Sequence, residues 1–177
     1  QRQHPDLFRL DVAITRAFAE RAAEAARRGD EPMRLFAQRT IDIENLWSAI
    51  ALTEGVPDVD AGSLFVSGGT LLRADDLLAA AAARTPVALS TALRMRVAGT
   101  PLSHAIEPDQ RPREDRALEA MVAEYRRIAL RDPLSTAPII SFVLRQRREV
   151  HVLLTVTWGI ALGASHRVIE DAIGVAA

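Results

Sequence analysis

The chain has 177 residues, of which 49% are hydrophobic and 25% are charged, a balance typical of a folded globular protein and not of a disordered one. Its formal net charge of −1 provides no overall positive field, so a nucleic-acid partner is not expected. The sequence contains neither cysteine nor lysine, which excludes disulfides, thiolate metal sites, cysteine nucleophiles, Walker A lysines and Schiff-base lysines within the chain.

Two helices joined by a short turn are predicted at the start of the chain. The opening residues, QRQHPDLFRLD, lack the apolar segment of a signal peptide. The first helix covers about residues 7–28, with Asp6 as its cap and Gly29 at its end. Its predicted apolar face consists of Leu10, Ile14 and Phe18. The second helix opens at Asp30 and stops at Gly55, and the short turn predicts an antiparallel pair.

The second helix has polar residues beside its apolar stripe. The stripe is formed by Ile43, Leu46, Trp47 and Ile50. Asp42 and Asn45, three residues apart, lie along the edge of this stripe. Because an unpaired buried polar group costs about 1–3 kcal/mol, we expect them either to form a site or to fasten this helix to another segment.

Residues 56–73 break the helical pattern. Gly68 and Gly69 predict a turn that tolerates positive φ. A phosphate-binding loop is not favoured, because the segment has no GxGxxG pattern and no lysine follows it.

Two short helices and a loop are predicted next. The first helix covers residues 74–84, where Asp75 and Asp76 occupy its first turn and offset the helix dipole. The second covers residues 86–99, after a Thr85 cap. Residues 99–112 contain glycine and three prolines and form the expected mobile loop, where a single helical domain over residues 1–177 would subdivide.

Three helices are predicted for the remaining chain, over about residues 113–131, 138–163 and 165–173. The apolar stretch 150–164 is shorter than the ~20 residues that a bilayer span needs, so we expect a buried helix of a soluble protein. A strand over 150–158 is the alternative for this β-branched run, but no comparable second run is available to pair with it.

Residues that carry chemistry are sparse. The four histidines are His4, His104, His151 and His166, and none has the helical spacing of a metal pair. We therefore predict no catalytic, metal, cofactor or small-molecule site. Arg145, Arg147 and Arg148 lie on part of the long helix. A solvated face is the default interpretation, and contact with an acidic protein surface or with anionic lipid is the alternative.

Four segments, in order along the chain, carry a family resemblance. They are LFRLDVAITRAFAERAAEA, IDIENLWSAIALTEG, LFVSGGTLLRADDL and APIISFVLRQRREVHVLLTVTWGIALG. The matching positions are Asp42, Asn45, Leu46, Gly55, Gly68, Gly69, Leu77, Pro138, Phe142, Glu149, Gly159 and Gly163. Together these segments resemble the C subunits of the archaeal and bacterial vacuolar-type (V-type) ATPases, which are relatives of the eukaryotic d subunits. They correspond to about the C-terminal half of a full-length member, so a fragment or a truncated member is expected.

The resemblance implies an all-α bundle of about seven to eight helices that is not an enzyme. It implies a central-stalk (rotor) subunit of a V-type ATPase, which couples the rotating shaft to the membrane rotor ring during ion transport. The implied partners are the shaft subunits and the ring. The implied location is cytoplasmic, peripheral to the membrane through the complex, without a membrane span. Asp42 and Asn45 are then expected to bond backbone groups of a neighbouring segment, and the Gly68-Gly69 turn is the candidate partner.

Two departures from the family pattern support an alternative function. A basic Arg-Ala-Lys segment is replaced by Ala51, Leu52 and Thr53. Positions that are usually polar or basic are occupied by Val152, Leu154 and Ile160. The alternative is a stand-alone helical protein-interaction module, a divergent relative that is no longer part of an ATPase. A helical hydrolase that uses His104 or His151 is the third hypothesis.

Overall fold

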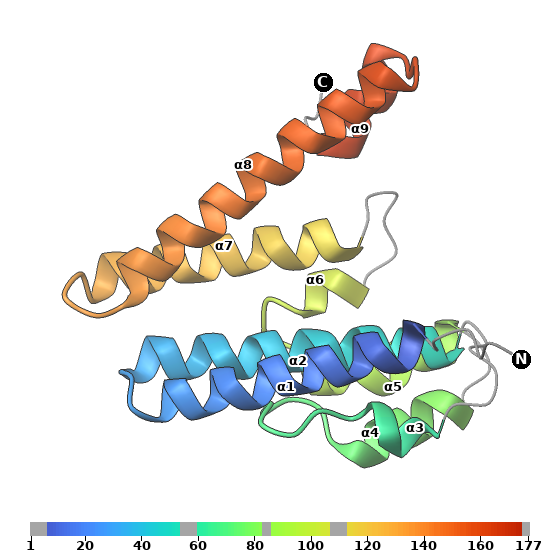
Figure 1. Cartoon of the computed structure of the whole chain (residues 1–177), viewed down its shortest axis with the longest axis vertical. Helices are drawn as coiled ribbons and strands as arrows, with labels where there is room; N and C mark the ends of the chain where they lie inside the picture. The colour runs from blue at the N-terminus through green and yellow to red at the C-terminus, as the bar shows by residue number, and fades with distance from the viewer. Residues whose placement is uncertain (1–6, 54–59, 83–85, 107–112, 175–177) are drawn as a thin grey trace, which may run out of the picture. The chain divides into compact units, whose positions relative to one another are not determined.

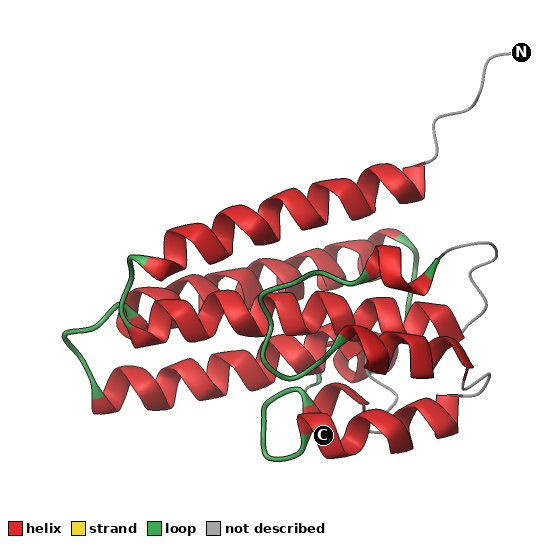
Figure 2. Ribbon diagram, turned by 90° about the horizontal axis from the view of Figure 1, so that it is seen from below, coloured by secondary structure: helices red, strands yellow, loops and turns green. Residues whose placement is uncertain are grey.

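Every regular element in the described part of the chain is an α-helix (Figure 1; Figure 2). The computed structural model describes residues 7–53, 60–82, 86–106 and 113–174. These ranges contain nine helices, so the predicted all-α class is confirmed and the strand alternative is excluded. Two of the helices have only four residues, which is too short to produce a helical period in the sequence.

The chain forms two compact units, residues 1–98 (unit 1) and residues 99–177 (unit 2). The boundary falls at the start of the segment 99–112, where the sequence predicts a subdivision. One domain over residues 1–177 stays a prediction.

In unit 1, α2 is the central helix because the other four helices pack against it. The helices are α1 (Leu7–Arg27), α2 (Glu31–Thr53), α3 (Ala61–Leu64), α4 (Ala74–Ala82) and α5 (Pro86–Val97). α2 begins after Asp30, whose carboxylate accepts the Met33 N–H at 3.1 Å. The predicted Asp6 and Thr85 caps lie outside the described residues. Buried residues of α2 include Ile41, Asp42, Asn45, Leu46, Ala49 and Ile50, so α2 buries more than the predicted stripe.

α1 packs through small residues, and the apolar face predicted for it is wrong. The residues of that face, Leu10, Ile14 and Phe18, are 53%, 59% and 60% exposed. A parallel stripe formed by Arg16, Ala19, Ala23 and Ala26 is buried or half-buried instead. The Arg16 guanidinium donates to the backbone oxygens of Ser63 (2.5 Å) and Phe65 (3.4 Å). These bonds, together with the close approach that alanines allow, determine which side of α1 faces inward.

In unit 2, a core forms between α7 and the first turns of α8. The helices are α6 (Ser103–Ile106), α7 (Arg113–Arg131), α8 (Ala137–Ala161) and α9 (His166–Ile173). The buried residues are Leu102, Ala105, Arg116, Ala117, Met121, Tyr125, Ala137, Ile140, Ser141 and Leu144. α7 ends before Asp132-Pro133, and α9 begins after Ser165, whose hydroxyl accepts the Val168 N–H at 3.4 Å.

The second half of α8 is not the buried helix that its composition predicts. No residue of α8 beyond Leu144 is buried, and apolar side chains such as Trp158 and Ile160 are 64% and 68% exposed. α7 buries the first turns of α8, whereas the last turns have the short helix α9 beside them. The apolar surface of α8 therefore exceeds what its neighbours in unit 2 cover. Within the described ranges, no helix combines the length and the hydrophobicity that a bilayer crossing requires.

α6 lies inside the segment predicted as a mobile loop. Residues 103–106 form a helical turn there, and its buried Ala105 anchors it. The guanidinium of Arg116 donates to the backbone oxygens of His104 (2.6 Å) and Ala105 (3.5 Å). These bonds satisfy carbonyl groups at the end of α6, and they explain why this part of the loop is helical. Residues 107–112 lie outside the described part of the chain.

Candidate functional site

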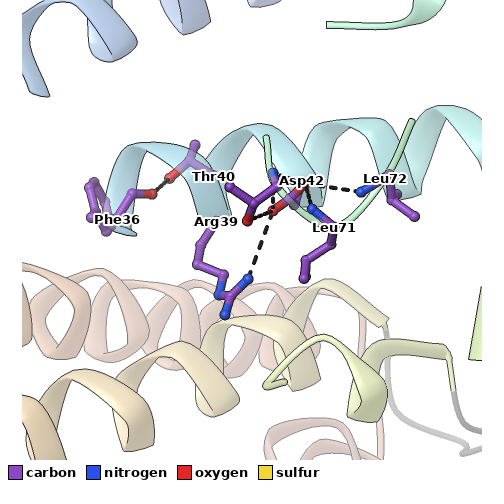
Figure 3. A network of polar contacts seen from close by, with 7 residues as sticks. Phe36, Arg39, Thr40, Asp42, Leu71 and Leu72 are labelled. Carbon is purple, nitrogen blue, oxygen red and sulfur yellow. Dashed lines mark hydrogen bonds and ion pairs between the residues drawn. The ribbon is translucent and has the colours of Figure 1, made fainter. Parts of the chain in front are cut away.

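Asp42 binds three consecutive backbone N–H groups of the 65–72 loop, which follows α3 (Figure 3). The side chain is fully buried. Its Oδ1 accepts the N–H groups of Thr70 (3.0 Å), Leu71 (3.0 Å) and Leu72 (3.4 Å). Its Oδ2 accepts the Thr70 N–H at 3.1 Å and the Thr70 hydroxyl at 3.4 Å, and lies 3.9 Å from Arg39 Nη1. A carboxylate occupied by so many internal donors is an anchor for the loop.

Asn45 binds the same loop one turn further along α2. Its Nδ2 donates to the Val66 carbonyl at 2.9 Å, and its Oδ1 accepts the Val66 N–H at 2.8 Å. Both bonds are buried, and Asn45 is fully enclosed. The amide therefore satisfies both backbone groups of one residue, as a neighbouring strand would. Together with Asp42, it holds both ends of the Gly68-Gly69 turn.

Replacement of Asn45 by alanine is expected to lower the free energy of unfolding by about 2–3 kcal/mol, because it leaves a buried N–H and a buried carbonyl without partners. Chemical denaturation checks this value. Asn45→Asp is the matched control. It keeps an acceptor for the Val66 N–H but sets a charged oxygen against the Val66 carbonyl, so it should also destabilise the protein. A midpoint unchanged in both variants would remove the anchoring role.

The two glycines let the 65–72 loop lie directly on α2. Gly68 has a φ of 112°, and a Cβ there would lie 2.9 Å from Ile41 Cδ1. A Cβ on Gly69 would lie 2.3 Å from Asp42 Oδ1. Any side chain at position 69 would therefore displace the carboxylate from the N–H groups that it binds.

The structure separates the predicted site residues into two groups. Asp42, Asn45, Gly68 and Gly69 come together in unit 1. Arg145, Arg147, Arg148 and Glu149 lie exposed on α8 in unit 2. In this second group Arg148 Nη2 lies 3.1 Å from Glu119 Oε1, and Glu149 accepts a bond from Gln146 at 3.1 Å.

Sequence reasoning missed two arginines that fix the fold, Arg16 and Arg116. Both donate to backbone oxygens of short helices or of the residues that follow them. The sequence has 22 arginines, and local pattern does not distinguish these two from the solvated ones. The only available signal was the position of Arg16 in register with the alanines of α1.

Histidines and carboxylates do not converge in the described residues. No group of three or more His, Asp or Glu side chains is placed there as metal ligands would be. His151 Nε2 lies 2.7 Å from Asp115 Oδ1, and His166 Nδ1 lies 3.3 Å from Glu170 Oε2. Both pairs join an exposed histidine to a single carboxylate.

These features define an all-helical protein whose main buried polar cluster fastens a loop to a central helix. Residues 1–172 match the family model described as ATP synthase (C/AC39) subunit. The chain therefore belongs to the ATP synthase (C/AC39) subunit family, and the resemblance seen in the sequence is confirmed.

Curated relatives with this similarity are A-type ATP synthase C subunits of haloarchaea. The protein from Haloferax volcanii is 32% identical over 171 residues, which cover 93% of this chain and 49% of the relative. The proteins from Haloquadratum walsbyi and Halorubrum lacusprofundi are each 28% identical, and the matches cover 47% and 49% of their lengths. The chain thus spans about half the length of the curated relatives it matches. No solved structure matches it significantly.

Proposed function

We propose that the chain is a non-catalytic central-stalk part of an A-type or V-type ATP synthase, where it couples the rotating shaft to the membrane rotor ring. Membership of the ATP synthase (C/AC39) subunit family over residues 1–172 is the observation that carries this proposal. The partners would be the shaft subunits and the ring, and the chain would reach the membrane surface through the complex.

The anchored 65–72 loop suits a part that transmits torque. Such a part needs helices that keep their relative positions under load, and close-packed interiors transmit strain because their compressibility is low. The bonds from Asp42 and Asn45 tie the loop to the central helix at two points, separated by the Gly68-Gly69 turn. A fully satisfied buried polar network of this kind also specifies one packing arrangement.

Co-purification with the ATP synthase subunits of the same organism tests the proposal. The tagged chain is co-expressed with the shaft subunits, and separately with the ring, and each complex is measured by size-exclusion chromatography. We expect the chain to elute with at least the shaft subunits. A folded chain, verified by circular dichroism, that elutes alone in both experiments would contradict the coupling role.

A stand-alone interaction module is the second candidate, and the replaced basic segment at the end of α2 favours it. Ala51 and Leu52 are half-buried there, in place of the family's basic residues. The variant Ala51→Arg, Leu52→Ala, Thr53→Lys restores the family pattern. If the natural chain binds neither set of subunits and this variant binds the shaft, the module interpretation is supported and the loss of contact is located.

A further inference from the structure

An open groove of about 1180 Å³ runs along unit 2 between α7 and α8 and reaches the end of α9. Its lining from α7 and the following turn is Val122, Arg126, Ala129, Leu130 and Pro133. Its lining from α8 and α9 is Pro138, Ser141, Arg145, Arg148, Glu149, Val152, Leu153 and Ile173. All of these residues belong to unit 2, so the groove is complete within it.

Large apolar side chains in the groove remain open to solvent. Leu130 is 77% exposed and Leu153 is 65% exposed, although they lie on different helices. Val152 and Val122, also in the lining, are only half-buried. A contiguous apolar surface of this kind, rimmed by charged residues, is characteristic of a protein contact surface.

The charge around this groove is strongly positive, in contrast to the chain as a whole. Residues 125–149 contain six arginines and only two carboxylates, whereas the whole chain has a net charge of −1. Three of the arginines line the groove: Arg126, Arg145 and Arg148. Arg148 is paired with Glu119, but within the described ranges neither Arg126 nor Arg145 contacts a carboxylate. Glu149 is the single acidic residue of the lining.

We infer that this groove binds an amphipathic α-helix of a partner protein, with apolar residues on one face and Asp or Glu residues along its edges. Apolar grooves bind such helices through side chains spaced at i, i+3, i+4 and i+7. The carboxylates would pair with Arg126 and Arg145, for which the described part of the chain provides none. The α8 lining from Pro138 to Leu153 would accommodate about four helical turns, or about 24 Å. The groove would bind this helix whether or not the chain is built into an ATP synthase.

A pair of synthetic peptides tests the chemistry of the occupant. Each is about 16 residues long, with leucine at the i, i+3, i+4 and i+7 positions of a helix. One has glutamate at the remaining positions and the other has lysine. Fluorescence anisotropy with the full chain should show saturable binding of the glutamate peptide, weaker at high salt, and no binding of the lysine peptide. No binding of the glutamate peptide, or equal binding of both, would overturn the inference.

Two matched pairs of variants test the location. Arg145 and Leu153 line the groove, whereas their neighbours on α8, Arg147 and Leu154, are exposed but do not line it. Arg145→Glu and Leu153→Ser should each weaken binding of the glutamate peptide by about tenfold. Arg147→Glu and Leu154→Ser should change it by less than about twofold. All four positions are exposed, and melting curves verify that the variants fold.

Equal losses within each pair would overturn the inference, because the occupant would then lie on the whole surface of α8 and not in the groove. Sedimentation with vesicles of anionic phosphatidylglycerol tests a flat lipid surface. Vesicle binding that depends equally on Arg145 and Arg147 would assign this face to a membrane. Sedimentation equilibrium tests a second copy of the chain, and self-association that Leu153→Ser abolishes and that excludes the peptide would assign the groove to a dimer contact.

Discussion

Replacement of Asp42 by alanine is expected to lower the free energy of unfolding by about 4 kcal/mol, one of the two largest effects that any single substitution should have in this chain. The carboxylate accepts the N–H groups of Thr70, Leu71 and Leu72 from a fully buried position. Hydrogen bonds to a charged group contribute about 1.5–3 kcal/mol each. The sum is larger than our value because part of the loop can regain water when the anchor is lost.

Urea denaturation measures this effect, and tryptophan fluorescence can follow unit 1 specifically. Trp47 lies on α2 near the anchor, whereas Trp158 lies on α8. In a Trp158→Phe background, Trp47 is the single tryptophan. Asp42→Asn is the control variant, because it keeps one acceptor oxygen but loses the charge, and its destabilisation should be intermediate. An Asp42→Ala midpoint equal to that of the natural chain would show that the loop does not depend on this carboxylate.

Replacement of Gly69 by alanine is expected to destabilise the protein by about 3 kcal/mol through overpacking. The new Cβ would lie 2.3 Å from Asp42 Oδ1, so either the loop or the carboxylate must move. The control is Gly62→Ala in α3, where the Cβ would have ordinary contacts, the nearest at 3.5 Å from Asp60 Oδ1. That variant should stay within about 0.5 kcal/mol of the natural chain.

The double variant Asp42→Ala, Gly69→Ala shows whether the two effects share one cause. Alanine at position 42 removes the atom with which the new Cβ collides. The double variant should therefore be about as stable as Asp42→Ala alone, with a coupling of about 2–3 kcal/mol. Additive losses would mean that Gly69 acts through something other than contact with Asp42.

Helix positions were predictable from the sequence because their end signals are local. Asp30, Asp132-Pro133 and Ser165 mark helix boundaries, and the structure places helix ends next to each of them. Asp42 and Asn45 stood out for a related reason, since two polar groups beside an apolar stripe require partners. Their actual partners, the backbone groups of Val66 and of residues 70–72, are 21 to 30 residues away, and no local pattern encodes that pairing.

Which face of a helix is buried was harder to predict, because hydrophobicity alone does not decide it. In α1 the alanine stripe faces inward while Leu10, Ile14 and Phe18 remain exposed. The deciding contacts are the bonds from Arg16 to the 63–65 backbone, and an arginine reads as a solvated residue in a pattern search. In α8 the apolar residues beyond Leu144 outnumber the neighbours that unit 2 offers, so composition predicted a burial that the packing does not provide.

Amide hydrogen exchange, resolved by NMR, tests most directly whether the 65–72 loop is fixed to the central helix. The N–H groups of Val66, Thr70, Leu71 and Leu72 all donate to side chains of α2. We predict that they exchange as slowly as the amides in the core of α2, and that Asp42→Ala releases those of residues 70–72 while leaving the α2 amides protected. Rapid exchange of these four groups in the natural chain, at the rate of an unprotected loop, would contradict a rigid, anchored coupling part.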